Sequence, residues 1–324
     1  MKLVQLFIYI FLFSLLTENV LIGEQAFFKS SQFKNCLIEG SINVDKVLES
    51  KFYKQLEAIV PKNDSSSLTK FDSIDNLFHK KNYKIEHFTF AIELKKETNE
   101  IPQFSSKNYN FICLTILNKK ITFNELFDIL KNSGLDLTII KINSLSVLET
   151  KIDGQKLYLY TENNFILGGF KENLSEFLKK TKGKIPPIDY DLLEQNNADA
   201  LLTLNISQIY KKEINLDKQS SLGIYGIDTN IFKNISKIRI ELKFKDNKAF
   251  CSALISTNNK KNSDSLYLLL KQFIPIVKYK LLTTDNGKFS NLANSINFKK
   301  MSESKVELNA SFTASELYFI INSK

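Results

Sequence analysis

The chain has 324 residues, of which 43% are hydrophobic, and it carries 26 Phe, 12 Tyr and a formal net charge of +9. This apolar content excludes a mainly disordered chain and is enough to fill the core of one large or two ordinary domains. The basic charge does not indicate nucleic-acid binding, because Arg239 is the only arginine and the lysines form short pairs among acidic residues rather than a continuous stripe.

Residues 1–26 are predicted to be a signal peptide. Lys2 precedes the apolar run Leu3–Leu16, which contains no charged residue. That run is shorter than the about 20 apolar residues that a membrane-spanning helix needs. We therefore expect a secreted or periplasmic protein.

The cleavage site of this segment is weakly marked. Gly23 and Ala26 are the small residues that could precede a cut, so the mature chain is expected to begin between Glu24 and Phe27. Two alternatives stay open, namely an uncleaved membrane anchor that extends to Ile22 and a buried N-terminal strand or helix of a cytosolic protein.

Alternating apolar and polar residues predict the strands. The clearest pattern is a hairpin, in which Lys237–Lys245 and Lys248–Ser256 are joined by a turn at Asp246-Asn247. The other predicted strands are Leu37–Val44, Glu86–Leu94, Tyr109–Leu117, a meander of Val147–Ile152, Lys156–Thr161 and Phe165–Phe170, then Ala198–Ile206, Leu292–Phe298 and Val306–Phe312.

Apolar residues at helical spacing predict the helices. The predicted helices are Val44–Ile59, Leu68–His79, Thr122–Asn132, Asn173–Lys180, Ser207–Lys212, Asp264–Leu282 and Ala314–Ile321. Asp45, Thr122 and Ser263 are the expected N-caps. Pro275 removes a backbone donor from the long helix, so a kink or break is expected near Phe273.

The order of these elements suggests an α+β fold of two similar halves, each a mainly antiparallel sheet with helices on one face. The predicted domains are residues 27–183 and 184–324, joined by the linker Lys180–Ile188, which Pro186-Pro187 stiffens. A chance similarity between two strings of α and β elements is the alternative to an internal repeat.

Several short segments carry a resemblance to a known group. They are Asn43–Val47, Gly134–Leu137, Leu157–Tyr160, Phe165–Gly169 and Ala198–Asn205. Together they resemble a loose group of uncharacterised exported bacterial proteins built from two α+β repeats. The resemblance covers nearly the whole mature chain and implies a fold, but it implies no activity and no site residues.

The three cysteines do not indicate a disulfide framework. Cys36 lies behind a polar stretch rather than directly after the apolar run, so it is not placed for a lipid anchor. Cys113 and Cys251 lie in apolar strands, where we expect buried thiols. If one pair did cross-link, these two would be the candidates.

No residue is nominated as catalytic, cofactor-binding or metal-binding. His79 and His87 are the only histidines, and they belong to no metal-ligand motif. Gly168-Gly169 precedes a helix and could let an anion approach, although a turn that needs small residues explains it better. The densest acidic patch is Asp189, Asp191 and Glu194 around a tyrosine, and a helix start accounts for it.

The sequence thus predicts a non-enzymatic exported binding or envelope-associated protein, in one version a carrier of a hydrophobic ligand in a Phe-lined cup. The partner would be an apolar small molecule or another envelope protein, with no nucleic acid and no cofactor. Membrane contact is expected only through the N-terminal segment if it stays uncleaved. The alternative is a secreted hydrolase, which needs two converging carboxyl groups, one with its pKa raised by burial.

Overall fold

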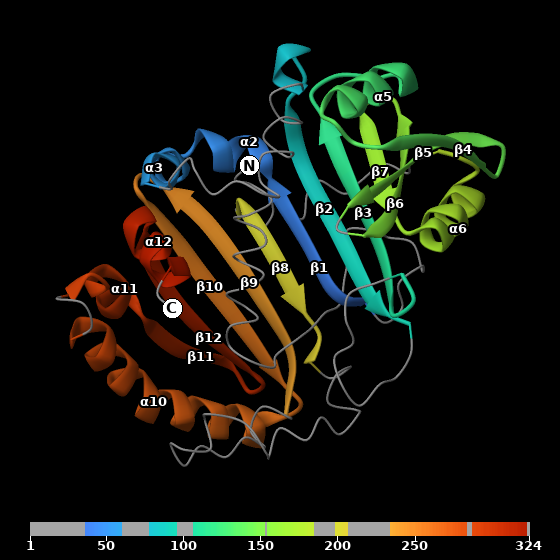
Figure 1. Cartoon of the computed structure of the whole chain (residues 1–324). Coiled ribbons are helices and arrows are strands. Elements are labelled where there is room, and N and C mark those ends of the chain that lie inside the picture. Colours follow the sequence, from blue (N-terminus) through green and yellow to red (C-terminus); the bar gives the residue numbers. More distant parts are fainter. Residues whose placement is uncertain are drawn as a thin grey trace.

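A computed structural model of the chain describes residues 36–59, 78–95, 106–152, 154–184, 198–206, 234–283 and 287–322. These residues form one sheet of 12 strands with helices packed on it (Figure 1), which confirms the α+β class. The strands are β1 (Cys36–Asn43), β2 (Ile85–Leu94), β3 (Tyr109–Leu117), β4 (Leu137–Ile142), β5 (Leu145–Ile152), β6 (Gln155–Glu162), β7 (Phe165–Gly169), β8 (Ala200–Leu204), β9 (Ile235–Lys245), β10 (Lys248–Thr257), β11 (Asn297–Ser302) and β12 (Lys305–Thr313). The helices are α2 (Val44–Glu49), α3 (Lys51–Ile59), α5 (Phe123–Asn132), α6 (Lys171–Thr181), α10 (Lys260–Thr283), α11 (Ser290–Ser295) and α12 (Ala314–Asn322).

The strand order is β11-β12-β10-β9-β8-β1-β2-β3-β7-β6-β5-β4, and all neighbouring strands are antiparallel. The sequence leaves open whether the two halves share one sheet, and the described residues form a single continuous sheet. The strands up to β7 and those from β8 onward form two neighbouring blocks, and β1 pairs with β8 to join them. Strands β1 and β8 each have a neighbouring strand on both sides. One continuous sheet is thus favoured over two separate sheets, which would each expose an apolar edge strand.

The hairpins follow the turn residues of the sequence. Asp246 has a φ of 55° between β9 and β10, and Asn163 has a φ of 57° between β6 and β7. Asn and Asp tolerate this left-handed conformation better than most residues, which fits a two-residue hairpin turn. The predicted hairpin and the meander from β5 to β7 are confirmed.

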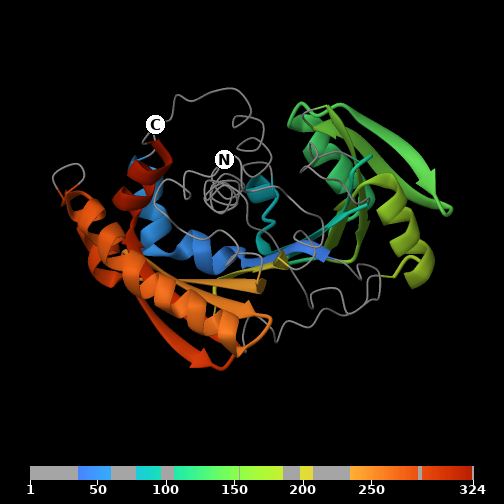
Figure 2. The same cartoon turned by 90° about the horizontal axis from the view of Figure 1, so that it is seen from below.

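The helices cover the two ends of the curved sheet differently (Figure 2). At the C-terminal end, Phe52 of α3 packs on Phe244 and Phe312, with ring centroids 5.3 and 5.9 Å apart, and Leu317 of α12 joins the same cluster. At the other end, α5 and α6 pack on opposite faces, through clusters around Leu126 and Phe177 respectively.

The middle of the sheet carries a third cluster that is rich in phenylalanine. Its rings include Phe88 and Phe90, with centroids 6.1 Å apart, and Phe111 and Phe170, 5.7 Å apart. The aliphatic members come from strands β1, β2, β6, β8 and β9, and none of the described members lies inside a helix.

Several predicted helix ends are corrected. The predicted helix Val44–Ile59 is two helices, because the Ser50 hydroxyl donates to the Val47 carbonyl and accepts from the Tyr53 N–H, ending α2 and starting α3. The N-cap of α2 is Asn43 rather than Asp45, since the Asn43 side chain accepts from the Lys46 N–H at 3.0 Å.

Thr122 is confirmed as the N-cap of α5. Its hydroxyl accepts from the Glu125 N–H at 3.2 Å, while the Glu125 carboxylate accepts from the Thr122 N–H at 2.9 Å. This reciprocal pair is a capping box, and it satisfies two backbone donors that the first turn would leave without partners.

Two further predictions about the C-terminal end are corrected, namely a strand and, of the kink or break expected near Phe273, the break. The predicted strand Leu292–Phe298 is the short helix α11 followed by the first residues of β11. The long helix α10 also continues through Pro275 without a break. The carbonyl that loses its donor there belongs to the exposed Lys271, where water can hydrogen-bond to it, so the cost of the proline is reduced.

The strand β4 was not predicted. Its burial does not alternate, and Ile139 is 53% exposed at the edge of the sheet, so period-2 alternation gives no signal there. Most of the predicted helix Leu68–His79, the helix Ser207–Lys212, the signal segment and residues 185–188 of the linker lie outside the described residues, whereas Lys180 and Thr181 of the predicted linker belong to α6. Among the described helices, none is long and apolar enough to span a membrane.

The close approach of β7 to β3 gives a stability test. A Cβ atom at Gly169 would lie 2.5 Å from the backbone oxygen of Phe111, so Gly169→Ala must push two strands apart. We expect it to lower the free energy of unfolding by about 1–3 kcal/mol in urea titrations followed by circular dichroism.

Gly134→Asn is the matched control, because Gly134 has a φ of 81° and no heavy atom within 4 Å of an added Cβ atom. Asn tolerates a positive φ, so this change should cost less than about 1 kcal/mol. Equal stability of the Gly169→Ala variant and the native chain would contradict the described register.

Candidate functional site

The two histidines do not form a site. His79 is exposed, and His87 lies on β2, in register with Asn43 and Ile116. Across the part of the chain that the structure describes, no three His, Cys, Asp or Glu side chains are grouped to hold a metal ion.

All three cysteines are free thiols. Cys113 on β3 and Cys251 on β10 are five strand spacings apart, which at about 4.8 Å per spacing is far beyond the reach of a disulfide. Burial raises the pKa of the Cys113 thiol to about 12 and that of Cys251 to about 11. The pKa of Cys36 is raised as well, first by burial and then by the nearby Glu39 charge. None of the three is a thiolate nucleophile at neutral pH.

Close packing explains the Gly168-Gly169 pair, because an added Cβ atom would lie 2.8 Å from the Cys113 sulfur at Gly168 and 2.5 Å from the Phe111 backbone oxygen at Gly169. Asn173 in the first turn of α6 accepts from the Phe111 N–H at 3.0 Å, which fixes the helix start against β3. Glu172 also lies in that first turn and pairs with Lys95, so a bound anion would meet a carboxylate.

The carboxyl groups whose pKa is shifted in the described ranges are all shifted downward. Hydrogen bonds from Thr122 lower the pKa of Glu125, the Lys156 ammonium lowers that of Glu149, and the Lys299 ammonium lowers that of Glu307. A general acid needs the opposite shift. The acidic patch Asp189, Asp191 and Glu194 lies outside the described residues.

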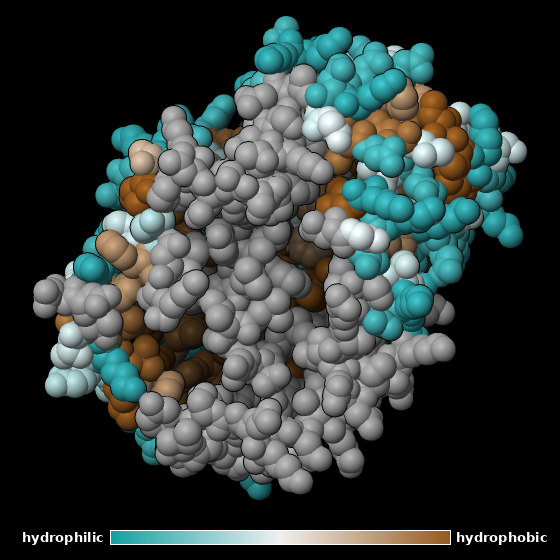
Figure 3. Space-filling view, in the orientation of Figure 1, coloured by the Kyte–Doolittle hydropathy of each residue, from teal (hydrophilic) through white to brown (hydrophobic). Residues whose placement is uncertain are grey.

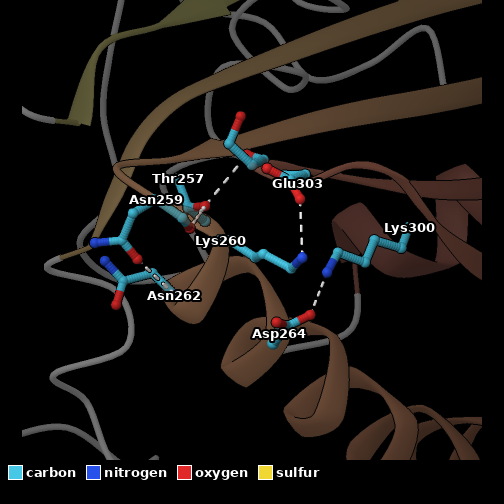
Figure 4. Close-up of polar contacts among 8 residues, drawn as sticks. Thr257, Asn259, Lys260, Asn262, Asp264, Lys300 and Glu303 are labelled. Atoms are coloured by element: carbon cyan, nitrogen blue, oxygen red, sulfur yellow. Dashed lines mark hydrogen bonds and ion pairs between the residues drawn. The ribbon is translucent and has the colours of Figure 1, made fainter.

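Helix α10 exposes a set of large apolar side chains, and a hydrogen bond and two ion pairs hold its first residues in place. Asn259 caps the helix, since its side chain accepts from the Asn262 N–H at 3.0 Å (Figure 4). The predicted cap Ser263 is instead a buried helical residue. The Thr257 hydroxyl lies 3.0 Å from the Asn259 carbonyl oxygen and 3.2 Å from that of Ser304.

Two ion pairs join the first turns of α10 to the β11–β12 hairpin. Lys260 lies 2.8 Å from Glu303 in the hairpin turn, and Asp264 accepts from Lys300 of β11 (Figure 4). These side chains are partly exposed, so each pair contributes little stability alone. Their effect is to fix the direction in which the helix leaves the sheet.

The inner side of α10 packs on the sheet as predicted. Leu266 is buried with Ile255 and Val306, and the Tyr267 ring lies 5.3 Å from the Phe298 ring. The predicted apolar stripe lies on this side, and its members are buried or half-buried: Leu266, Leu269, Leu270, Phe273, Val277 and Leu281.

The outer side of α10 is also apolar, and sequence reasoning missed this. Leu268, Ile276, Tyr279 and Leu282 are 57%, 51%, 69% and 43% exposed. Leu268 lies three helical turns before Tyr279, and Ile276 and Leu282 flank Tyr279 at a spacing of three, so all four share one side. We call these four residues the outer stripe. Apolar surface shows at the left of Figure 3, where Figure 1 places the C-terminal half of α10.

Polar residues border and interrupt the outer stripe. At 100° per residue, Lys271 and Lys278 lie along one edge of it and Lys280 along the other. Gln272 lies within it, two turns before Tyr279. An apolar surface with lysines at its rim and an amide inside it is suited to bind a partner, because large apolar side chains are otherwise rarely exposed in a line.

No protein-family model and no curated protein sequence matches the chain. A distant structural resemblance links it to TP0453. Crystal form III of TP0453 superimposes with a TM-score of 0.46 at 10% sequence identity, covering 89% of this chain and 94% of that chain. Crystal forms IV and I give TM-scores of 0.44 and 0.43 at 9% identity, each covering 88% of this chain and 92% of that chain.

The burial of the thiols gives a chemical test. Because the pKa values of Cys113 and Cys251 are raised to about 12 and about 11, we expect no reaction with a charged thiol reagent such as DTNB at pH 8 in the native protein. In urea all three thiols should react. A thiol that reacts fast at pH 8 without denaturant would contradict the raised pKa values.

Proposed function

We propose that the chain is an exported, non-enzymatic binding protein of the cell envelope that docks on another envelope protein through the outer stripe of α10. The observation that carries this proposal is the exposure of Leu268, Ile276, Tyr279 and Leu282 along one side of a helix whose other side is packed. Burial of such side chains in an interface releases about 25 cal/mol per Å² of apolar area.

The chemistry of the stripe favours a protein partner over a lipid surface. Gln272 lies among the apolar side chains, and hydrocarbon would offer its amide no hydrogen bond, whereas a protein surface can. Lys271, Lys278 and Lys280 at the rim complement a partner with acidic side chains around an apolar groove. The partner is thus expected to present an apolar groove with an acidic rim.

The fixed start of the helix supports docking of a preformed surface. The direction of α10 is set in the unbound protein by the Asn259 cap and by the ion pairs Lys260–Glu303 and Asp264–Lys300. A preorganised helix loses less conformational entropy on binding than one that must first fold.

A carrier of a hydrophobic ligand is the second candidate. The central cluster around Phe88, Phe90 and Phe111 favours it, because no described helix residue belongs to that cluster. In the described part of the chain, however, these rings contact one another. We therefore rank the carrier behind the binding protein.

The docking proposal is tested by photo-crosslinking in the native host. With p-benzoylphenylalanine replacing Tyr279, we expect one discrete protein adduct, because this side chain is 69% exposed in the middle of the stripe. The same residue replacing Met301, which is 51% exposed on β11, is the control and should give no such adduct.

The double variant Ile276→Ser/Leu282→Ser should reduce the yield of the Tyr279 adduct at least roughly tenfold. The matched variant Ile139→Ser/Met301→Ser changes equally exposed apolar residues and should leave the adduct intact. Flotation of the purified protein with phosphatidylglycerol-containing vesicles that depends on the stripe, in the absence of a protein adduct, would overturn the proposal in favour of a lipid surface.

Export and ligand loading are tested together by native mass spectrometry of the protein from its host. We expect a mature chain that begins between Glu24 and Phe27, with no bound apolar molecule. A chain that retains Met1–Leu16 would contradict cleavage. A stoichiometric apolar adduct would move the second candidate ahead of the first.

A further inference from the structure

The face of the sheet opposite α3 and α12 contains an open depression of about 630 Å³ at the C-terminal end. The residues of its floor come from different strands, and the register of the sheet places them next to one another. Lys243, Phe250 and Ser311 lie side by side on β9, β10 and β12.

A second row lies two residues further along each strand. Glu241, Ser252 and Asn309 form it, and Asn297 of β11 extends it by one strand. Neighbouring strands are about 4.8 Å apart and residues two apart along a strand are about 6.8 Å apart, so the two rows span an area the size of a sugar ring or two. Asn294 of α11 lines the rim.

Part of this polar lining is already used within the protein. Ser252 donates to Glu307 at 3.0 Å, Asn297 donates to the Ser295 carbonyl at 3.0 Å, and Glu241 lies 2.9 Å from Arg239. These contacts fix the side chains of the second row in place. A fixed polar lining reduces the entropy lost when a ligand binds.

Other groups in the depression are available to a ligand. Within the described ranges, the Lys243 ammonium and the Asn294 amide make no hydrogen bond or ion pair, and Phe250 is 43% exposed between the two outer strands of the floor. Lys243 offers donors only, and Asn294 offers both donors and an acceptor. The Phe250 ring offers an apolar face whose π electrons attract the weakly positive C–H groups of a ligand.

We propose that this depression binds a neutral saccharide. Sugar hydroxyls both donate and accept hydrogen bonds, which matches amide, ammonium and carboxylate groups placed around an aromatic floor. The C–H face of a pyranose ring would lie on Phe250. Glu241 is already paired with Arg239 at 2.9 Å, so Lys243 is the charged group of the described lining that is left to donate to a sugar hydroxyl.

An apolar ligand fits this site poorly. It would strip water from Lys243, Asn294 and the second-row amides without replacing their hydrogen bonds, which costs free energy for each group. The saccharide site is separate from the outer stripe, since the residues described for it lie on β9, β10, β11, β12 and α11 rather than on α10. The two proposals can therefore fail independently.

The test is saturation-transfer NMR of the purified protein with maltose, cellobiose and N-acetylglucosamine, followed by a glycan array. We expect saturation transfer to the ring protons of at least one saccharide. Phe250→Ser and Asn294→Ala should each weaken that binding at least roughly tenfold. Lys305→Met, an exposed change outside the depression, should leave it unchanged.

Circular dichroism melting curves check that the variants fold, and Phe250 is exposed enough that its loss should change the melting temperature little. The proposal is overturned if no saccharide binds up to millimolar concentration on either assay, or if binding survives both Phe250→Ser and Asn294→Ala. Displacement of a bound saccharide by inorganic phosphate would also overturn it, because the depression would then be an anion site on Lys243.

Discussion

The pairing of β1 with β8 is the constraint on which the rest of the structure depends. Five register pairs, from Ile38↔Leu204 to Ile42↔Ala200, join strands that are far apart in the sequence, and every residue of β8 is buried. Gly40 lies within this pairing, where an added Cβ atom would lie 2.5 Å from the Phe90 ring. The missing side chain lets that ring lie across β1, so the central phenylalanine cluster and the continuous sheet depend on the same contact. Without it, each block would expose an apolar edge strand.

Local signals in the sequence predicted most of the elements. Alternation located the β9–β10 hairpin, and positive-φ residues such as Asp246 located its turn, because these features depend on neighbours close in the chain. The joining of the two blocks depends on contacts between distant residues, which no local pattern encodes. The edge strand β4 was missed because Ile142 is its only buried residue, so its burial imposes no alternation, and α11 was missed because a six-residue helix has too few residues for a helical period.

The surfaces proposed for binding were equally hard to read from the sequence. The helix α10 is apolar on both its inner and its outer side, so its periodicity predicts one packed stripe but cannot show which residues stay exposed. The depression depends on the side-by-side placement of Lys243, Phe250 and Ser311, which are up to 68 positions apart in the sequence. Only strand register brings them together. The predicted absence of a catalytic motif and the proposed binding role remain consistent with each other, since binding needs no reactive group.

Among the described residues, the sheet of 12 strands ends in two edge strands, β11 and β4, which differ in their tendency to self-associate. At one edge, β11 carries Lys299 and Lys300 and its register shifts before Ser302, and both features discourage another extended chain from adding to it. At the other edge, β4 has the run Thr138-Ile-Ile140 with a single following lysine, and Ile139 is exposed. Addition of a foreign strand, and hence aggregation during overexpression, would start at β4. A charged residue at position 139 would act as a gatekeeper there.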